Sequence, residues 1–297
     1  MAVMLSQFRP TLWAGNLIVD TDKAFVFANL ANRDYEGLIT GKGNIVKINE
    51  IGDITVSNYT ENEDITISTL TGAQKELVID QAKYFAFNVD DVLAAQSNVA
   101  VLSGAMQKAA FAIANTVDAF VAGLYAEAGI ATSGLGTSGT SLSLYAAHLT
   151  AASSLLGMFS NMNRYANEAS LPTQGRWYAI PPWMASYVSF AGLVDNWSKG
   201  GNKLGDPVSK GTGYIGNVMG WDLYSSNNVS TNGSTQWRCM FGTKDAISFA
   251  GQVTKVETGR VEKQFGDYVK GLYVYGAKVV RPDHLGVVYA DDGGYST

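Results

Sequence analysis

The sequence is poor in the residues from which most catalytic and metal sites are built. It has one cysteine, Cys239, and two histidines, His148 and His284. One cysteine excludes an intrachain disulfide framework and a multi-cysteine metal site, so the compartment is reducing or cysteine is simply not used. A Ser-His-Asp site, or a metal site with two histidines, would need one or both histidines, and neither lies in a recognisable spacing motif. We therefore expect structural or surface roles for both.

Positive charge is also scarce. Lys and Arg number 21 against 26 Asp and Glu, which gives a net charge of −5, and no basic run is present. Tight nucleic-acid binding needs clustered Lys and Arg to displace counterions, so it is not expected. The first ten residues lack the charged and apolar regions of a secretion signal, and no apolar stretch approaches ~20 residues without a polar interruption. Neither a signal peptide nor a membrane-spanning helix is expected.

Phosphate-binding and nucleophile motifs are missing, with one partial exception. Neither a Walker A sequence nor a Gly-x-Ser-x-Gly motif occurs. Residues 211–216 spell GxGxxG, but a dinucleotide loop needs a strand before it and a helix after it. Asp206-Pro207 precedes this motif and a strand-like run follows it, so a turn-rich loop is expected. These absences together predict no enzyme, no cofactor and no metal.

The residues that are present predict a globular chain with a long hairpin. The 297 residues are 46% hydrophobic and 16% charged, which suits one large domain or two modest ones. Residues 41–89 are strand-rich, because apolar residues alternate with polar ones at 53–60, at 65–68 and again over 77–89. A hairpin of this length is marginal alone, so we expect it to lie against something else.

A single long helix is predicted over residues 90–128. Asp90 and Asp91 are suited to cap its first turn. Its apolar residues step by three or four, which is typical of a helical stripe. They are Leu102, Met106, Ala109, Ile113, Val117, Phe120 and Leu124. Roughly 35 residues at ~1.5 Å each would give a rod of about 50 Å.

The remaining chain predicts two further helices and several short strands. A second helix is expected over 142–169, closed by Pro172, and a third over 183–196 after Pro181-Pro182. One side of the second helix carries its apolar residues, which are Tyr145, Leu149, Ala152, Leu156, Phe159 and Met162. Strands are expected at 176–180, 221–224, 236–242, 246–249, 272–280 and 285–289.

Two charged groups are the candidate site residues. Glu61, Glu63 and Asp64 form an acidic group at the expected hairpin tip. The basic group, which alternates with Glu257 and Glu262 on an expected strand, is Lys255, Arg260 and Lys263. One interpretation of the acidic group is a solvated turn. The other is a contact with the basic group of a neighbouring subunit, in which each pair is weak but many copies fix the register.

The tryptophans lie late in the chain. Trp177, Trp183, Trp197, Trp221 and Trp237 fall within 61 residues. They fit either a carbohydrate-stacking surface or aromatic packing in a small α/β core, and the packing interpretation is the stronger one.

The order of these elements resembles the major capsid proteins of tailed phages of the Hong Kong 97 type, over nearly the whole chain. The runs that carry the resemblance are 51–56 (IGDITV), 79–92 (IDQAKYFAFNVDDV), 175–182 (GRWYAIPP) and 275–282 (YGAKVVRP). The resemblance implies an α+β capsid fold. Its parts are an N-terminal arm at 1–40, an extended β-hairpin arm (E-loop) at 41–89, a P-domain with the spine helix at 90–172, a mixed α/β A-domain at 173–250, and strands that return to the P-domain at 251–297.

The resemblance also implies the function and the partners. Hexamers and pentamers of this homo-oligomeric chain would form an icosahedral shell around double-stranded DNA, without sequence-specific binding and without a membrane. The shell would be the virion capsid, assembled in the host bacterial cytoplasm. The N-terminal region is too short for a fused scaffolding domain, so a separate scaffolding protein is expected beside a portal protein and a decoration protein.

Two rival functions remain at this point. An encapsulin-like nanocompartment shell has the same fold but encloses a protein, and the neighbouring genes would distinguish it from a phage. A Trp-rich glycan-binding protein would instead stay a small oligomer, and its tryptophan fluorescence would shift with sugar.

Overall fold

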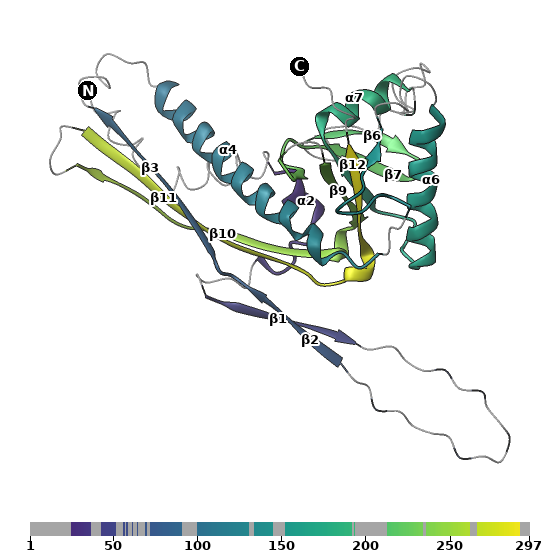
Figure 1. Ribbon diagram of the computed structural model, residues 1–297. Helices are drawn as coiled ribbons and strands as arrows, with labels where there is room; N and C mark the ends of the chain where they lie inside the picture. Colours follow the sequence, from purple (N-terminus) through teal and green to yellow (C-terminus); the bar gives the residue numbers. More distant parts are fainter. Residues whose placement is uncertain are drawn as a thin grey trace, which may run out of the picture.

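The computed structural model describes residues 25–36, 43–51, 72–90, 100–130, 134–144, 152–191, 213–233, 236–261 and 266–291, and the single positions 56, 58, 61, 64, 69 and 193. Figure 1 shows three parts: a body of sheet and helices that includes α6 and α7, a long three-stranded sheet with α4 along it, and the ribbon of β1 and β2. This mixture of helix and sheet agrees with the predicted α+β class.

The body is built on a seven-stranded sheet in the order β4-β12-β9-β5-β7-β6, with β8 paired to β9. Its strands are β4 (Leu142–Ser143), β5 (Arg176–Ile180), β6 (Tyr214–Val218), β7 (Trp221–Ser225), β8 (Ser230–Thr231), β9 (Gln236–Thr243) and β12 (Leu285–Asp291). Helices α6 (Ala152–Glu168) and α7 (Pro182–Phe190) meet over Tyr178. The hydroxyl of Tyr178 lies 3.9 Å from Met158 Sδ and 3.7 Å from Met184 Sδ.

The second sheet has three antiparallel strands in the order β10-β11-β3. They are β3 (Gln81–Asp90), β10 (Ile247–Arg260) and β11 (Gly266–Val279). The 3-10 turn η3 (Lys244–Ala246) leads from the body into β10, and the 3-10 turn η4 (Pro282–His284) leads from β11 back into the body. The spine helix α4 (Ala100–Ala122) continues as the 3-10 helix η2 (Gly123–Glu127). Met106 and Ala110 of α4 pack with Val269 of β11, so α4 covers one face of this sheet.

The predicted apolar stripe of the spine helix is confirmed in part, because Ala109, Phe120 and Leu124 are only half-buried. Met106, Ile113 and Val117 are buried. By length and composition alone, the helical residues Gly104–Glu127 could cross a bilayer. The sequence predicts no such helix. One face of this helix packs on the sheet and on the main core, and the other face is exposed, so we assign the helix to the packing of the subunit.

The ribbon consists of β1 (Ile45–Ile51) and β2 (Gly72–Val78), which pair antiparallel. One face of the ribbon is apolar and buried, through Val46, Ile48 and Leu77, which pack with Ala250 and Val274. The ribbon therefore rests on the three-stranded sheet at its base and leads away from the body (Figure 1). The predicted strands at 53–60 and 65–68 lie outside the described residues, apart from isolated positions.

One predicted helix start is wrong, and another lies outside the described residues. Asp90 is the last residue of β3 and lies opposite Gly266, and residues 91–99, which follow it in the predicted spine helix, are not described. Leu142 lies in β4 opposite Ala290, and the described part of the second helix begins at Ala152. In both places the backbone pairs with a strand far away in the sequence, a partner that no local pattern indicates. The described part of the spine helix is 23 residues long, or ~35 Å.

Three further expectations need correction. Residues 81–89, assigned to the hairpin arm, pair with β11 instead of with the ribbon. Leu156, expected on the apolar side of the second helix, is 39% exposed. The third helix starts as predicted after Pro181 but ends at Phe190, while β5 matches its predicted bounds.

The aromatic residues confirm the packing interpretation of the tryptophan-rich region. Trp221 is fully buried and meets Phe241 edge to face, with ring centroids 5.3 Å apart. Trp177 is also buried. A ring that is already enclosed cannot stack on a sugar, so these two residues do not supply a glycan surface. Trp197 lies outside the described residues.

Cys239 is fully buried in the body, beside Tyr178. Burial raises the pKa of its thiol to about 12, although a hydrogen bond with Tyr178 acts in the opposite direction. The thiolate is the reactive form, so native Cys239 should react with a disulfide reagent at pH 8 at least ~1000-fold more slowly than an unfolded chain. Release of the reagent's chromophore with and without urea measures this, and rapid labelling in native buffer would contradict it.

Candidate assembly surfaces

Two residues of the acidic group, Glu61 and Asp64, are described by the structure, and both are exposed. Glu63 lies outside the described residues. Glu61 is in a turn, as the sequence predicts.

The basic group lies at the outer half of the β10–β11 hairpin. Lys255 is exposed and forms an ion pair with Glu257 of the same strand. Lys270 of β11 lies 2.7 Å from the other carboxylate oxygen of Glu257. Hydrogen bonds from Lys255 and then Lys270 hold the pKa of the Glu257 carboxyl at about 2. Two cations thus share one carboxylate, so this part of the strand keeps a net positive charge.

The other predicted basic residues are only partly described. Arg260 is exposed at the end of β10, opposite Asp267 in the strand register. Lys263 lies outside the described residues.

One subunit does not bring the two charged groups together in its described residues. The basic group belongs to the β10–β11 hairpin, which runs along α4, whereas β1 and β2 lead away on the other side of the molecule (Figure 1). Among the residues that the structure describes, no ion pair joins Glu61 or Asp64 to Lys255. A contact between these groups would therefore need two subunits.

Apolar side chains that face solvent form a second kind of surface, which the sequence analysis did not single out. Ile45 is 51% exposed and lies opposite Val78, which is 42% exposed, on the open face of the ribbon. Tyr84 of β3 is 80% exposed. The sequence could not identify this surface, because the neighbouring residues Ile45 and Val46 are both apolar. Only their packing shows that Ile45 faces outward and Val46 inward.

Backbone bonds hold the two ends of the ribbon to each other at its base, and one side chain joins the ribbon to the residue that follows β11. The amide of Gly43 donates to the carbonyl of Ile79 (2.8 Å), and the amide of Ile79 donates to the carbonyl of Asn44 (3.0 Å). The ammonium of Lys75 donates to the carbonyl of Val280. The ribbon therefore has a defined direction relative to the three-stranded sheet, while its outer face remains open.

The described residues contain no catalytic or metal-binding arrangement. No group of three or more His, Cys, Asp or Glu residues that could hold a metal occurs among them. Nδ1 of His284 lies 3.2 Å from the hydroxyl of Thr243. Burial, and to a smaller extent the charge of Arg281, lowers the pKa of the His284 imidazole. Tyr214 to Gly216 of the GxGxxG run lie in strand β6, so no helix follows to face a phosphate. His148 lies outside the described residues.

A family model described as "Phage capsid protein" matches residues 74–290, which is more than two thirds of the chain. The chain belongs to the phage capsid protein family. The match covers β2, the three-stranded sheet, the spine helix and the body, so it includes the surfaces described above except β1 and the acidic tip. This family is one of structural proteins, in agreement with the expected lack of an enzyme function.

Solved structures of phage capsids share the fold. A structure from Mycobacterium phage Che8 is 27% identical, with a TM-score of 0.64, and the match covers 91% of this chain and 92% of that one. The capsid of cyanophage P-SCSP1u is 18% identical, with a TM-score of 0.60 over 91% and 89% of the two chains. These matches and the family confirm the predicted Hong Kong 97-like fold and the function of a tailed-phage major capsid protein, a component of the virion shell.

The fold is not restricted to phages. A virus-like particle from Pyrococcus furiosus is 10% identical, with a TM-score of 0.52 over 94% and 98% of the two chains. The fold alone therefore does not separate a phage shell from the encapsulin-like rival, and the family match favours the phage. No curated protein matches the chain.

Proposed function

We propose that this capsid protein forms hexamers and pentamers that close into an icosahedral shell around double-stranded DNA. The observation that carries the proposal is the ribbon: its base is packed on the three-stranded sheet, whereas Ile45 and Val78 on its outer face are exposed. The exposed outer face of the ribbon contributes little to its own subunit. It gains stability when a neighbour covers it.

Within this proposal the chain keeps the domain division implied by its resemblance, with one adjustment. The N-terminal arm is 1–40, the E-loop 41–89, the P-domain 90–172, the A-domain 173–250 and the return strands 251–297. Because β3 pairs with β11, the part of the E-loop that projects ends near Val78. The spine helix and the three-stranded sheet then form the P-domain. The seven-stranded sheet forms the A-domain core, and it also takes in β4 from the range 90–172 and β12 from the range 251–297.

The proposed partners follow from the shell. A separate scaffolding protein guides closure, a portal protein occupies one vertex, and a decoration protein binds the outer surface. Assembly takes place in the cytoplasm of the host bacterium. The net charge of −5 suits a shell that confines DNA without binding it tightly.

The test is electron microscopy of the purified protein in negative stain, with sedimentation of the same sample. We expect closed uniform shells, or hexamers and pentamers that convert to shells when scaffold is added. A subunit that stays monomeric or dimeric in the presence of scaffold would overturn the proposal.

The arm itself is tested by deleting residues 60–64. The subunit should keep its circular dichroism spectrum and its melting temperature, because the two described residues of this segment, Glu61 and Asp64, are exposed. Shell yield should fall at least tenfold, since the arm acts mainly between chains. A deletion variant with wild-type yield would remove the arm from the assembly contacts.

We also propose the charge contact between Glu61, Glu63 and Asp64 of one subunit and Lys255, Arg260 and Lys263 of the next. The positive excess around Lys255 supports it. The double variant Glu61→Lys with Asp64→Lys should lower the shell yield, and adding Lys255→Glu should restore part of it. Exposed pairs are worth about 0.2–1 kcal/mol each, so the loss should grow as salt is lowered. An unchanged shell yield in the charge-reversed double variant would contradict this contact and favour the other interpretation, in which the acidic group is a solvated turn.

A further inference from the structure

Arg238 lies in β9 on the face of the seven-stranded sheet that is opposite to α6 and α7. Phe241 of the same strand packs on Tyr178 beneath these helices, with ring centroids 6.5 Å apart. Side chains alternate between the two faces of a strand, so Arg238, three residues earlier, points to the other side. In the strand register Ser230 of β8 and Tyr289 of β12 lie directly opposite Arg238, one on each side. The three side chains therefore leave the same face of the sheet in one row.

The half-buried guanidinium of Arg238 has few acceptors for its N–H groups. Its Cζ lies 4.6 Å from the centroid of the Tyr125 ring in η2, and Nη1 donates to Oγ of Ser230 over a long 3.4 Å. Nε is buried and has no hydrogen-bond partner. Nη2 also lacks an acceptor, but it is open to solvent. Asp291 leaves the same face as Tyr289, two residues further along β12, and within the described part of the chain neither it nor another carboxylate forms an ion pair with Arg238.

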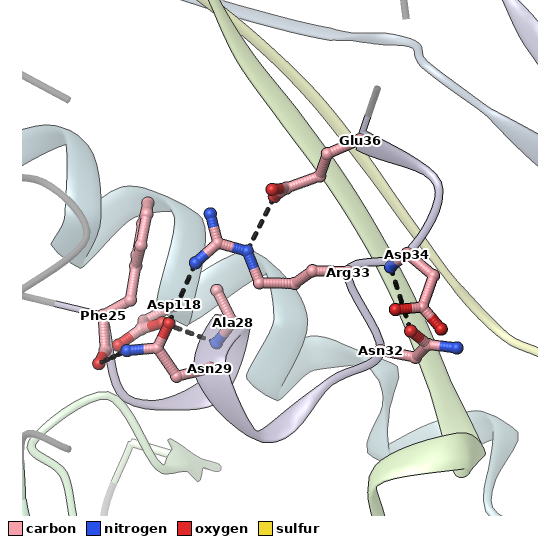
Figure 2. Close-up of polar contacts among 8 residues, drawn as sticks. All are labelled: Phe25, Ala28, Asn29, Asn32, Arg33, Asp34, Glu36 and Asp118. Carbon is pink, nitrogen blue, oxygen red and sulfur yellow. Dashed lines mark hydrogen bonds and ion pairs between the residues drawn. The ribbon is translucent and has the colours of Figure 1, made fainter. Parts of the chain in front are cut away.

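Comparable charged groups elsewhere in the subunit have close partners. Figure 2 shows that the carboxylate of Asp118 accepts backbone amides at the start of the short helix α2 (Phe27–Leu30), at 2.7 and 3.2 Å. The guanidinium of Arg33 donates to a carboxylate oxygen of Glu36 at 2.8 Å (Figure 2). The buried guanidinium of Arg176 donates to two backbone carbonyls and two side-chain amide oxygens. Arg238 differs from all three, because its charge is held by a ring face and one hydroxyl.

The free edge of the Arg238 guanidinium has the shape that an oxyanion needs. Nη1 already donates to Ser230, and Nε and Nη2 lie along the other edge. Two parallel N–H groups of this kind form the fork that binds two oxygens of a carboxylate or a phosphate. Taking a guanidinium partly out of water is unfavourable until acceptors replace that water, and the face of Tyr125 attracts the cation without accepting the N–H groups in its plane. An oxyanion that enters from solvent at Nη2 supplies the missing acceptors.

We propose that Arg238 is the centre of an oxyanion site, with Nη2 and Nε as donors and Ser230 and Tyr125 as the side chains that hold the guanidinium in place. The ligand is a carboxylate or a phosphate group. In the shell its source is a carboxylate of a neighbouring subunit, a statement that rests on the proposed function. The chain has 26 acidic and 21 basic residues, and a shell packs many copies side by side, so a neighbour's carboxylate is the oxyanion held at high local concentration.

The site is tested on the full-length subunit, held below the concentration at which sedimentation detects assembly. Compared with chloride at equal ionic strength, about 50 mM phosphate should raise the melting temperature of the wild type by about 2 °C more than that of Arg238→Gln. Arg164→Gln is the matched control, since Arg164 also lies over a tyrosine ring, at 4.5 Å, but has Glu168 as its ion-pair partner. It should respond like the wild type. An equal response of the wild type and Arg238→Gln would overturn the proposal.

A second measurement does not depend on the folding of Arg238→Gln. The Nε–H resonance of Arg238 in the wild-type subunit, assigned through its absence in Arg238→Lys, should move saturably as phosphate is added. A resonance that stays in place over the whole titration would overturn the oxyanion site.

The source of the ligand in the shell is tested with Arg238→Lys, which keeps the charge and supplies an amine. A carbodiimide joins such an amine only to a carboxylate in contact with it. Shells assembled from equal amounts of isotope-labelled and unlabelled subunits should give cross-linked peptides of mixed label that join position 238 to an acidic residue. Shells without such peptides would overturn the neighbour as the source and, beside a positive phosphate response, would assign the site to a free oxyanion. If no shells form, the proposed function fails, and the phosphate response still decides whether the site exists.

Discussion

Replacing Arg176 with alanine should lower the free energy of unfolding by about 3–5 kcal/mol. Arg176 opens strand β5, is only 4% exposed, and lies over the ring of Trp221 at 5.4 Å. Its guanidinium donates to four oxygens between α6 and β5. They are Pro172 O (2.8 Å), Leu171 O (2.9 Å), Asn167 Oδ1 (2.8 Å) and Asn163 Oδ1 (3.3 Å).

The size of this effect follows from what alanine leaves behind. The carbonyls of Leu171 and Pro172 end the turn after α6, where Ser170 has a φ of 58°, and they would lose their donor. Leu171 is buried, and a buried acceptor without a partner costs about 1–3 kcal/mol, whereas Pro172 is exposed and its carbonyl can bond to water. The space once filled by the arginine side chain adds to the loss. Burial also lowers the pKa of Arg176, which shows that its charge is held there at a cost. Removing this charge offsets only part of the lost stability.

Urea unfolding followed by tryptophan fluorescence measures the change, and two variants separate its causes. Arg176→Met keeps most of the volume and should still lose the share that comes from hydrogen bonds. Arg164→Ala removes an exposed arginine whose partner, Glu168, lies at 3.5 Å, and should cost less than ~1 kcal/mol. If Arg176→Ala were as mild as Arg164→Ala, the network would be incidental to stability.

Replacing Gly276 with alanine should abolish most shell formation. Gly276 lies in β11 where the base of the ribbon crosses it, and a Cβ there would overlap the carbonyl oxygen of Val78 and lie 3.1 Å from Ile79 Cα. Backbone atoms cannot move aside as a flexible side chain does, so the ribbon must shift. Overpacking of this kind costs about 1–3 kcal/mol, and the shift also changes the direction in which the ribbon leaves the subunit.

Shell yield by sedimentation and microscopy, with subunit melting temperature beside it, tests this prediction. Gly157→Ala is the matched control, because Gly157 lies in α6 with nothing within 4 Å of its added methyl group. That variant should be neutral or slightly stabilising, since alanine favours helix over glycine. Normal shells from Gly276→Ala would mean that the ribbon tolerates another direction, or that it does not set the assembly geometry.

Local patterns in the sequence were enough for several elements. Strand β5 matches its predicted bounds because a fully buried apolar run lies between Gly175, with a φ of 73°, and Pro181. The stripe of α4 was predicted because helical spacing places Met106, Ile113 and Val117 on one face. The resemblance to phage capsid proteins added the family, which the family match confirms. It also added the order of the domains, which stays a prediction.

The contact of Asp118 with the backbone around Phe27 was not predicted, although one signal was present. Asp118 is a single acid among apolar and small residues of a helix, and such a residue is either solvated or has a buried partner. Its partners are amides, which every residue except proline carries, so the sequence could not identify Val26 and Ala28 as the donors.

The sequence by itself determined the type and order of most elements, the apolar face of the spine helix and the family, because these depend on periodicity and composition within short windows. Only the tertiary structure decided that β3 pairs with β11, that β4 pairs with β12, and that Ile45 faces outward while Val46 faces inward. Strand pairing joins residues far apart in the chain, and a shift of one residue would reverse every face. Its register is therefore set by packing of the whole subunit and not by the local sequence.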